Sequence, residues 1–439
     1  MSTRFHKFGL ALLLLLVAAG AQAEIKYVLL FIGDGFGPAQ RELTETLLGR
    51  KLMMSTLPTA ARTGTDNYGG TVTDSAASGT AIACGVKTNN GVIGMDHELR
   101  PVASLAARLK ERGFKVGLVS SSPLNDATPA AHYAHQPSRS MLDEIAAEIP
   151  ATGVDYLGGA ALAGNAEASY AMLQDNGYTV IAANDALTRL PDSDKVYAVA
   201  QPFTRWTTEQ ASSRPTLAEH TRAAIAQLYN PDGFFLMVEN GHTDYAGHSN
   251  DAGKLIHEVV ALDEAVQAGL AFQALHPQET LLIVTADHET GGLNIDQMKA
   301  ALLPLLRLQK QEIGAIAGEA RQRLKDSKLT TAAGLVEFFE DQLGLAQQPF
   351  TAVERQTVIT ALGGTDADQS GLAEHLDDGL RAAFRCRDAR LGIAYTTGGH
   401  SGAKIITNAA GPGCELFAEP LENSDIPQRI EKAMSQHAD

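Results

Sequence analysis

The chain has 439 residues, of which 44% are hydrophobic and 20% charged, so it is long enough to bury a large core and has the composition of a globular protein. Its 35 basic and 51 acidic residues give a net charge of −16. This excess of acidic residues argues against nucleic acid as a partner.

The first 23 residues differ from the rest of the chain. Arg4 and Lys7 precede an apolar run from Leu10 to Ala19, and small residues follow at 21–23. This order is typical of a signal peptide, and the run is shorter than the roughly 20 residues that span a bilayer. We therefore expect residues 1–23 to be removed, the mature protein to be periplasmic or secreted, and no stable membrane anchor to remain. Cleavage leaves 33 basic residues against 51 acidic ones.

Short apolar runs alternate with helical segments along the rest of the chain. Helices are predicted at Pro101–Arg112 and Ala252–Ala274, and strands at Lys26–Ile32, Lys115–Ser120, Tyr178–Ala182, Gly233–Val238 and Thr280–Thr285. Such alternation predicts an α/β fold, a three-layer sandwich in which a large, mainly parallel sheet is flanked by helices.

The residue composition and the spacing of apolar residues change at about residue 296. Residues 296–391 are rich in Ala, Leu, Gln, Glu and Arg at helical spacing, and strand signals return at Ile393–Thr396 and Ala403–Thr407. We therefore expect a helical insertion at 296–391 in a catalytic domain formed by 24–295 and 392–439.

One segment of the insertion, Asp366–Asp377, carries oxygen ligands at several positions of a calcium loop and glycine at the sixth. The final glutamate of such a loop is absent, and Asp and Ser before a helix are also common N-caps. We favour caps over Ca²⁺ here.

Carboxylates and histidines follow three of the apolar strands. Asp34 ends the first strand within Gly33–Gly37, Glu239 is followed by Asp244 and His248, and Asp287 is followed by His288. Sheets of this type bind ligands at the carboxyl ends of their strands. So many charged groups at apolar strand ends would be costly to bury without cations, and the pattern predicts one metal site to which His400, in a later Gly-Gly-His-Ser-Gly run, also contributes.

Ser75, in Thr73-Asp74-Ser75-Ala76, is the candidate nucleophile. The small residues that follow it suit a closely packed helix, whose N-terminus favours an anion. By itself the motif is better explained by an N-cap at Asp74 or Ser75.

A further set of polar residues follows the strand at Lys115–Ser120. Asp126 and Thr128 offer the hard oxygen ligands that magnesium prefers, and Arg139 could bind phosphate oxygens in a forked geometry, although it could also be a surface charge. His132 and His135 are better explained as structural residues. Of the three cysteines, we expect Cys386 to pair with Cys414 and Cys84 to be free, although the sequence does not fix the pairing.

Taken together and in chain order, these motifs resemble the alkaline phosphatases from about Ile25 to Gly402, apart from the insertion. The resemblance implies two Zn²⁺, one Mg²⁺ and a phosphoserine intermediate on Ser75, with Asp74 orienting Arg139. By family correspondence, one zinc would be held by Asp244, His248 and His400, and the other by Asp34, Asp287 and His288. Magnesium would be held by Asp34, Thr128 and Glu239, with Asp126 acting through water.

These roles predict an enzyme that hydrolyses small phosphate monoesters. Three divalent ions bring six positive charges against the five ligating carboxylates, so that with Arg139 the site is near +2 before Asp74 is counted. Such a site suits a phosphate monoester dianion. The alternatives are a phosphodiesterase or nucleotide pyrophosphatase of the same superfamily, a sulfatase, or an exported metal- or phosphate-binding protein without turnover.

Two features depart from the family pattern. Tyr245 follows Asp244 where other members often carry a lysine or histidine, so the pH optimum and the metal preference do not transfer. The insertion lies where the family varies most, near the rim of the cleft, so the natural substrate does not transfer either. The family resemblance also implies a homodimer.

Overall fold

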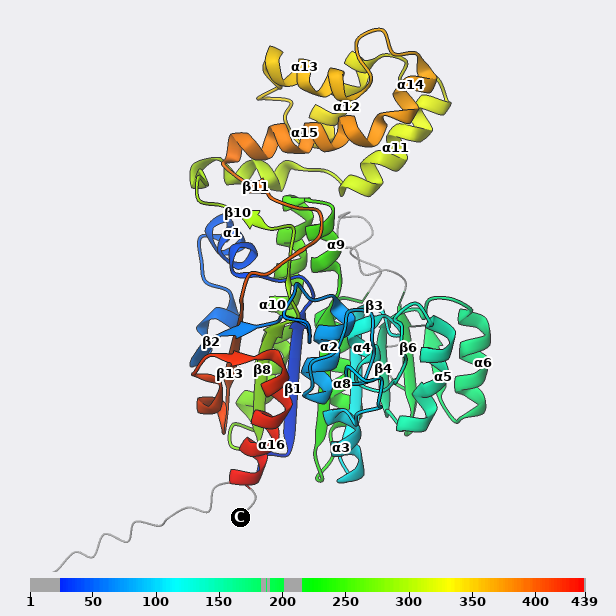
Figure 1. The fold of residues 1–439 in the computed structure, drawn as a ribbon, viewed down its shortest axis with the longest axis vertical. Coiled ribbons are helices and arrows are strands. Elements are labelled where there is room, and N and C mark those ends of the chain that lie inside the picture. The colour runs from blue at the N-terminus through cyan, green and yellow to red at the C-terminus, as the bar shows by residue number, and fades with distance from the viewer. Residues whose placement is uncertain (1–23, 183–186, 188–189, 201–214, 438–439) are drawn as a thin grey trace, which may run out of the picture.

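The computed structural model describes residues 24–182, 187, 190–200 and 215–437. The predicted signal peptide, residues 1–23, lies outside this part of the chain. A ten-stranded sheet runs through the centre of the molecule (Figure 1). Its strands, in order across the sheet, are β14 (Leu421–Glu422), β2 (Thr59–Gly64), β13 (Ile405–Ala410), β8 (Thr280–Ala286), β1 (Tyr27–Gly33), β7 (Phe234–Asn240), β3 (Lys115–Pro123), β4 (Tyr156–Ala160), β6 (Val196–Ala200) and β5 (Thr179–Ala182).

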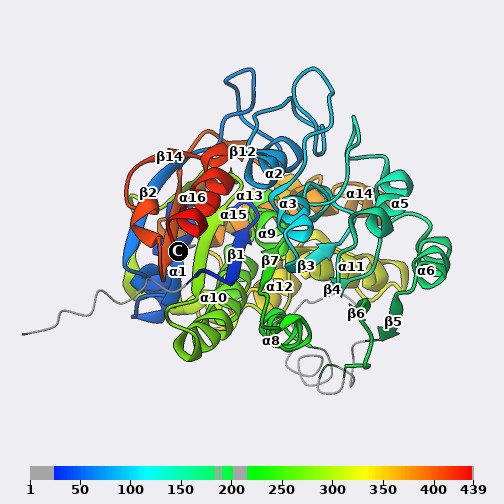
Figure 2. The same ribbon diagram turned by 90° about the horizontal axis from the view of Figure 1, so that it is seen from below.

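The sheet is mainly parallel, because among its described strands β13 alone runs against its neighbours, β2 and β8. Helices cover both faces, as Figure 2 shows along the strands. One face is covered by α1 (Pro38–Leu48), α8 (Leu217–Leu228) and α10 (Ala252–Leu275). The other is covered by α2 (Ser75–Cys84), α3 (Leu105–Glu111), α4 (Ala127–Ala130), α5 (Leu142–Thr152), α6 (Ala166–Asp175) and α16 (Ile426–Gln436). The fold is the predicted three-layer α/β sandwich.

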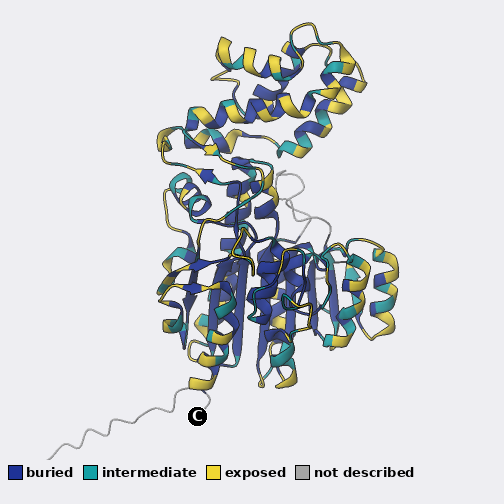
Figure 3. Ribbon diagram, in the orientation of Figure 1, coloured by how far each residue is buried: buried dark blue, intermediate teal, exposed yellow. Residues whose placement is uncertain are grey.

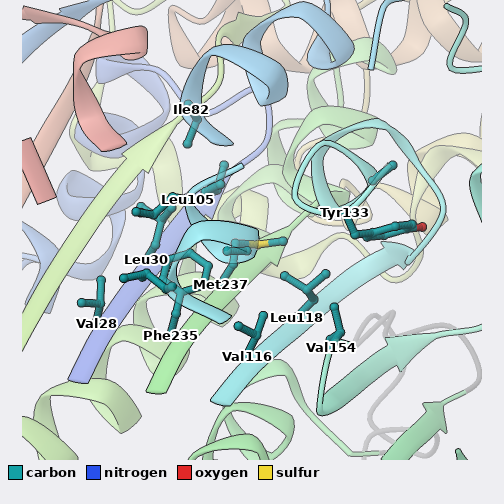
Figure 4. Close-up of a cluster of buried hydrophobic side chains, with 14 of the residues drawn as sticks. Val28, Leu30, Ile82, Leu105, Val116, Leu118, Tyr133, Val154, Phe235 and Met237 are labelled. Atoms are coloured by element: carbon teal, nitrogen blue, oxygen red, sulfur yellow. The ribbon is translucent and has the colours of Figure 1, made fainter. Parts of the chain in front are cut away.

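Two apolar cores lie on the two faces of the sheet, and alternate residues of each central strand enter opposite cores. Along β1, Leu29 and Phe31 face α10, whereas Val28 and Leu30 face the side of α2 and α3. Figure 4 shows the second core, in which Phe235 of β7 lies between Val28 of β1 and Val116 of β3. Because both faces are covered, the central strands are continuously hydrophobic, and Figure 3 shows them buried along their whole length.

The register of the three central strands places their ends side by side. Gly33 at the end of β1 pairs with Asn240 of β7 and with Ala286 of β8. The residues at these ends, and those directly after them, therefore meet at one edge of the sheet. This edge lies beneath the helices at the top of Figure 1.

Several short elements surround this edge. They are η1 (Met53–Thr56), α9 (His242–His248), β9 (Glu289–Thr290), β10 (Leu293–Asn294), η2 (Ala300–Leu308), β11 (Ala394–Tyr395), β12 (His400–Ser401), η3 (Cys414–Phe417) and η4 (Asn423–Asp425). Two small antiparallel pairs, β9 with β12 and β10 with β11, join the segment after β8 to the segment before β13. His400 is thereby paired with Thr290 and brought next to the end of β8.

A group of helices stands above the sheet (Figure 1). We call it the helical unit, and it comprises α11 (Ile313–Lys325), α12 (Ala332–Gln342), α13 (Ala352–Ala361), α14 (Gln369–Glu374) and α15 (Leu376–Leu391). It has a hydrophobic core of its own, which includes Leu335, Phe339 and Phe384. A buried polar chain ties it to the rest of the fold, because Arg387 donates to Gln309, which in turn donates to Asp251 at the start of α10.

The structure corrects one prediction about the cysteines. Cys386 packs against the core of the helical unit, whereas Cys414 packs against the core of the sheet, and both are free thiols. The predicted disulfide between them was therefore wrong, because their segments belong to different cores. Cys84 is free, as predicted.

The calcium-like segment has the structure of a capped helix. Asp368 is the N-cap of α14, where its Oδ1 accepts a hydrogen bond of 2.9 Å from the amide of Gly371. Asp377 forms an ion pair with Arg321, with 2.6 Å between Nη2 and Oδ1. These contacts engage two of the carboxylates that a calcium loop would need. Separately, in the described part of the chain no helix combines the length and apolar character needed to cross a membrane.

Candidate active site

Three predicted site carboxylates meet at the ends of the central strands. Asp34 follows β1, Glu239 is the penultimate residue of β7, and Asp287 follows β8. Glu239 pairs across the sheet with Ile32, two residues before Asp34. All three are buried away from water, and they are close enough for the charges of Asp287 and Glu239 to raise the pKa of Asp34.

Ser75 is the first residue of α2 and is buried beside these carboxylates. Its Oγ lies 3.2 Å from Nε2 of His288. Asp74 is the N-cap, and its Oδ1 accepts a hydrogen bond from the amide of Ala77. The sequence left open whether this motif was a cap or a nucleophile; the structure gives Asp74 the capping role and leaves the Ser75 hydroxyl facing the histidine.

Small residues allow α2 to lie close to the neighbouring polar loop. A Cβ at Gly79 would lie 3.1 Å from the backbone of Thr128 on α4. The glycine thus lets the helix that carries Ser75 pack against the helix that carries Thr128.

His288 is the centre of the first group of candidate metal ligands. Its Nε2 lies 3.2 Å from Asp287 Oδ2 and 3.6 Å from Asp34 Oδ1, and ligand atoms of the three residues lie within 4.8 Å of one another. Neither Asp34 Oδ1 nor Asp287 Oδ2 has a hydrogen-bond partner, although both atoms are buried. The group matches one of the two expected zinc sets.

The ionisation of this group reflects its burial. Burial, followed by the charges of Asp287 and Asp244, raises the pKa of Asp34 well above its ordinary value. Burial also raises the pKa of Asp287 to about 6 and lowers the pKa of His288 to about 4. In the absence of a cation, the carboxylates here are thus driven towards their protonated forms.

A second group lies next to the first. Ligand atoms of Asp244, His288 and His400 lie within 4.8 Å of one another, and the rings of His288 and His400 stack with centroids 3.6 Å apart. The exposed His248 joins this group, because its Nε2 lies 3.2 Å from Asp244 Oδ2 and 3.2 Å from His400 Nε2. All three members of the other expected zinc set are therefore in mutual reach.

Backbone carbonyls fix the two outer histidines. His248 Nδ1 lies 2.7 Å from the carbonyl of Gly398, and His400 Nδ1 lies 2.8 Å from that of Thr73. Each Nδ1 can therefore carry the proton, which leaves each Nε2 free to bind a cation.

Glu239 lies among serine hydroxyls. Its Oε2 accepts hydrogen bonds from Ser120 and, at 3.0 Å, from Ser122. Burial raises the pKa of Glu239 to about 8, against the opposing effect of the Ser120 hydrogen bond. Thr128, the other residue expected at the magnesium site, is buried and its Oγ1 has no partner.

Arg139 bridges two carboxylates at the half-buried side of the site. Its Nη2 donates to Asp126 Oδ1 at 2.9 Å, and its Nη1 lies 3.5 Å from Asp74 Oδ2. Asp74 Oδ2 also accepts from the amide of Gly91, whose carbonyl accepts from the amide of Arg139. Tyr245 reaches the same cluster, because its hydroxyl donates to Asp126 Oδ2 at 3.4 Å.

A family model described as "Alkaline phosphatase" matches residues 25–165 and 171–436, most of the chain. The chain belongs to the alkaline phosphatase family. Alkaline phosphatase 4 of Bacillus subtilis (strain 168) is 30% identical over 443 residues, covering 94% of this chain and 89% of the relative. The repressible alkaline phosphatase of Saccharomyces cerevisiae is 29% identical and covers 88% and 76%.

Solved structures of alkaline phosphatases have the same fold. The cold-active enzyme from the psychrophile Shewanella sp. matches with a TM-score of 0.77 and 28% identity, covering 94% of this chain and 99% of that one. A variant of the enzyme from the Antarctic bacterium TAB5, with Mg bound in its M3 site, matches with a TM-score of 0.67 and 25% identity over 94% and 99%. This member of the alkaline phosphatase family is accordingly a phosphoric monoester hydrolase.

The donor set of this alkaline phosphatase family member fits cations. Five carboxylates converge with Arg139 as the nearby guanidinium. Burial is the largest cause of the raised pKa values of three of them, Asp34, Glu239 and Asp287, so their ionised forms would be favoured by a nearby cation. Buried oxygens without partners occur at Asp34, Asp287 and Thr128. Buried polar atoms normally have a hydrogen-bond partner, and divalent ions would take the place of the partners that these oxygens lack.

The sequence analysis missed the residues that support the ligands. Thr290 donates to Asp244 Oδ1 at 2.5 Å and lies 3.2 Å from Nδ1 of His288, and Ser120 and Ser122 hold Glu239. The run Ser120-Ser121-Ser122 at the end of a predicted strand was a signal that could have indicated the support of Glu239 by Ser120 and Ser122. His132 is buried without ligating contacts, and His135 pairs with Glu148, consistent with structural roles for both histidines.

Proposed function

We propose that this alkaline phosphatase family member transfers the phosphoryl group of a monoester to Ser75 and then to water. The observation that carries the proposal is the contact of 3.2 Å between Ser75 Oγ and His288 Nε2, in a buried cluster with Asp34 and Asp287. A serine that served only as a cap would not need to face this cluster. Its place at the start of α2 also favours an anion, because the N-terminus of a helix carries partial positive charge.

Arg139 is proposed to bind two nonbridging oxygens of the phosphoryl group. Its guanidinium is held by Asp126 and Asp74, so its orientation is set before substrate arrives. A planar, forked donor suits two phosphate oxygens, and a fixed donor loses little entropy on binding. Asp74 thus acts through α2 and through Arg139, as a positioning residue.

The proposed metal content is two Zn²⁺ and one Mg²⁺. Asp34, Asp287 and His288 would hold one zinc; Asp244, His248 and His400 would hold the other; magnesium would be held by Asp34, Thr128 and Glu239, with Asp126 acting through water. The Mg-containing TAB5 relative supports a divalent ion besides zinc. When bound, the cations would lower the pKa of the attacking and leaving oxygens and neutralise charge on the phosphoryl group.

Two displacements complete the reaction. In the first, Ser75 Oγ forms a bond to phosphorus while the bond from phosphorus to the ester oxygen breaks, and the alcohol leaves with the proton that the serine loses. In the second, a water oxygen bonds to phosphorus, the Ser75–phosphorus bond breaks, and Ser75 regains a proton. Arg139 holds the same two oxygens through both steps, so the group need not be released between them.

A substrate panel with a chelator tests this proposal. Purified protein is assayed with 4-nitrophenyl phosphate, bis(4-nitrophenyl) phosphate and 4-nitrophenyl sulfate at alkaline pH, before and after chelation and after return of zinc and magnesium. We expect the monoester to be hydrolysed fastest, with activity lost on chelation and restored by the metals. Faster diester hydrolysis would favour a phosphodiesterase, faster sulfate hydrolysis a sulfatase, and absence of turnover a binding protein.

Three broader proposals accompany this function. We propose that residues 1–23 direct export to the periplasm or outside the cell, which N-terminal sequencing of the mature protein tests. We propose that residues 296–391 are a helical insertion at the rim of the cleft of a catalytic domain formed by 24–295 and 392–439. We further propose a homodimer, which light scattering of the purified protein tests.

A further inference from the structure

A pocket lies where the helical unit meets the active-site segments. It has a volume of about 280 Å³. One wall comes from α15, including Arg381, Phe384 and Arg385, and another from Ser249 and Asn250, the residues directly after α9. Tyr395 of β11 completes it. In Figure 1, α15 runs above β11 and α9, so the pocket is at the base of the helical unit.

Two arginines give the pocket a positive charge. Arg381 and Arg385 lie one helical turn apart on α15, and both are exposed. Among the described residues, neither has a carboxylate within ion-pairing distance. Asp388 also lines the pocket, but its charge is matched by Arg387, whose Nη2 lies 2.8 Å from its Oδ1. Two uncompensated cations at one pocket stand out in a chain whose net charge is −16.

The floor of the pocket is apolar. Phe384 and Ile393 are almost fully buried, and Ile313 contributes a further aliphatic surface. The hydroxyl of Tyr395, another lining residue, is buried without a hydrogen-bond partner. Small-molecule sites typically combine an apolar lining with a few polar groups in this way. An apolar body with an anionic group matches this combination, because the body can lie against the partly exposed Ile313 and Tyr395 while the guanidinium groups meet the charge.

The pocket shares its walls with segments that carry candidate metal ligands. Ser249 immediately follows His248, and Tyr395 lies on the segment that leads to His400. The side chain of Asn250, with its amide oriented to donate, would bridge the carbonyls of Gly247 and Thr397 within these same segments. A ligand here would therefore lie beside the active site while remaining distinct from the contacts of Ser75.

We propose that this pocket binds a small organic anion, with an aromatic or aliphatic body and a carboxylate or sulfonate group. The anion has two sources: the distal part of a phosphate monoester, or a separate molecule. Only the first source rests on the proposed function, because binding in the pocket does not require hydrolysis.

The test uses 2-naphthalenesulfonate, which is fluorescent and has no phosphate ester. The full-length, metal-loaded protein is titrated with it, in parallel with an Arg381→Gln/Arg385→Gln variant. A Lys325→Gln/Lys328→Gln variant is the matched control, since it removes the same charge from exposed positions of the helical unit outside the pocket. Urea unfolding of each variant verifies that the fold is retained.

We expect saturable binding to the wild type that is at least about tenfold weaker in the arginine variant, since two charge-assisted contacts are lost. The lysine variant should bind as the wild type does, and saturating inorganic phosphate, which occupies the active site, should not displace the probe. The proposal is overturned if no saturable binding occurs, if both variants lose affinity equally, or if phosphate competes.

A substrate pair identifies the source of the anion. The values of kcat/KM are compared for 2-naphthyl phosphate and for 6-sulfo-2-naphthyl phosphate. A preference for the sulfonated ester that disappears in the arginine variant shows that the pocket takes part of the substrate. An unchanged preference, with probe binding retained in the wild type, shows that it takes a separate molecule. If neither ester is hydrolysed, the proposed function fails while the probe titration still decides the binding proposal.

Discussion

Gly35 is the position where one methyl group should disturb the candidate metal centre most directly. Its φ is 67°, a left-handed conformation that costs an L-residue about 1–2 kcal/mol. A Cβ there would lie 2.7 Å from Thr290 Oγ1 and 2.8 Å from the Cα of Asp244. The threonine side chain can rotate, but the backbone of Asp244 belongs to α9 and must shift as a whole. We expect this overpacking to lower the free energy of unfolding of Gly35→Ala by about 1–3 kcal/mol more.

Gly49 offers a matched control for this substitution. Its φ is 66°, nearly that of Gly35, yet a Cβ there would meet nothing within 4 Å. Gly49→Ala should therefore cost only the conformational term of about 1–2 kcal/mol, and should leave turnover unchanged. A displacement of about 1 Å at a reacting centre can cost on the order of 100-fold in rate, which is the loss we expect for Gly35→Ala.

The assay combines urea unfolding with steady-state hydrolysis of 4-nitrophenyl phosphate at saturating zinc and magnesium. The zinc content of each variant, measured by atomic emission, provides a readout that does not depend on turnover. If Gly35→Ala retains the kcat and the zinc content of Gly49→Ala, then the contact between Gly35 and Asp244 does not determine the geometry of the site, and the reasoning is refuted.

Three further predictions concern phosphate, magnesium and protons. Arg139→Lys should weaken competitive inhibition by inorganic phosphate about tenfold, because an ammonium cannot fork onto two oxygens; an unchanged inhibition constant would remove Arg139 from phosphate binding. Glu239→Gln should lower the magnesium retained after dialysis, measured by atomic emission, and retention equal to wild type would contradict its role as a ligand. His132 is buried, and that burial lowers its pKa to about 3. Between this pKa and the unfolded pKa, the unfolded chain therefore carries a proton on His132 that the folded chain does not. The contribution of neutral His132 to stability is complete above the unfolded pKa near 6.5 and is lost as the pH falls towards 3. Between pH 7 and pH 5 the free energy of unfolding of the wild type, measured with urea, should therefore fall by about 2 kcal/mol more than that of His132→Leu. Equal losses would show that the folded chain protonates His132 as readily as the unfolded chain does, and that burial does not lower its pKa.

The hydrophobic pattern predicted the centre of the sheet well, because strands covered on both faces are continuously apolar. The runs that become β1, β7 and β8 carry this pattern, and each was predicted to within a few residues. The strands β2, β4 and β6 and the two-residue strand β14 were missed. Thr59–Gly64 is only partly buried, and Tyr156–Ala160 contains two glycines, so neither has the apolar pattern of a central strand.

The candidate site shows the same division between features that a linear pattern can predict and features that depend on the folded chain. Ligands such as Asp287 could be predicted because they come directly after a recognisable strand. The support that Thr290 gives to Asp244 could not, because it depends on α9 lying against β9, and no local pattern records that contact. The pairing of Cys386 with Cys414 was wrong for a similar reason, since sequence alone does not show to which core a helix belongs.

The most direct measurement is to trap the phosphoenzyme. The metal-loaded protein is incubated with inorganic phosphate, and is then quenched, digested and sequenced by mass spectrometry. The account predicts one phosphate on the peptide that begins α2, located on Ser75 and absent from Ser75→Ala, which should also lose turnover by orders of magnitude. A phosphate on any other residue, or a Ser75→Ala variant that turns over like the wild type, would contradict it.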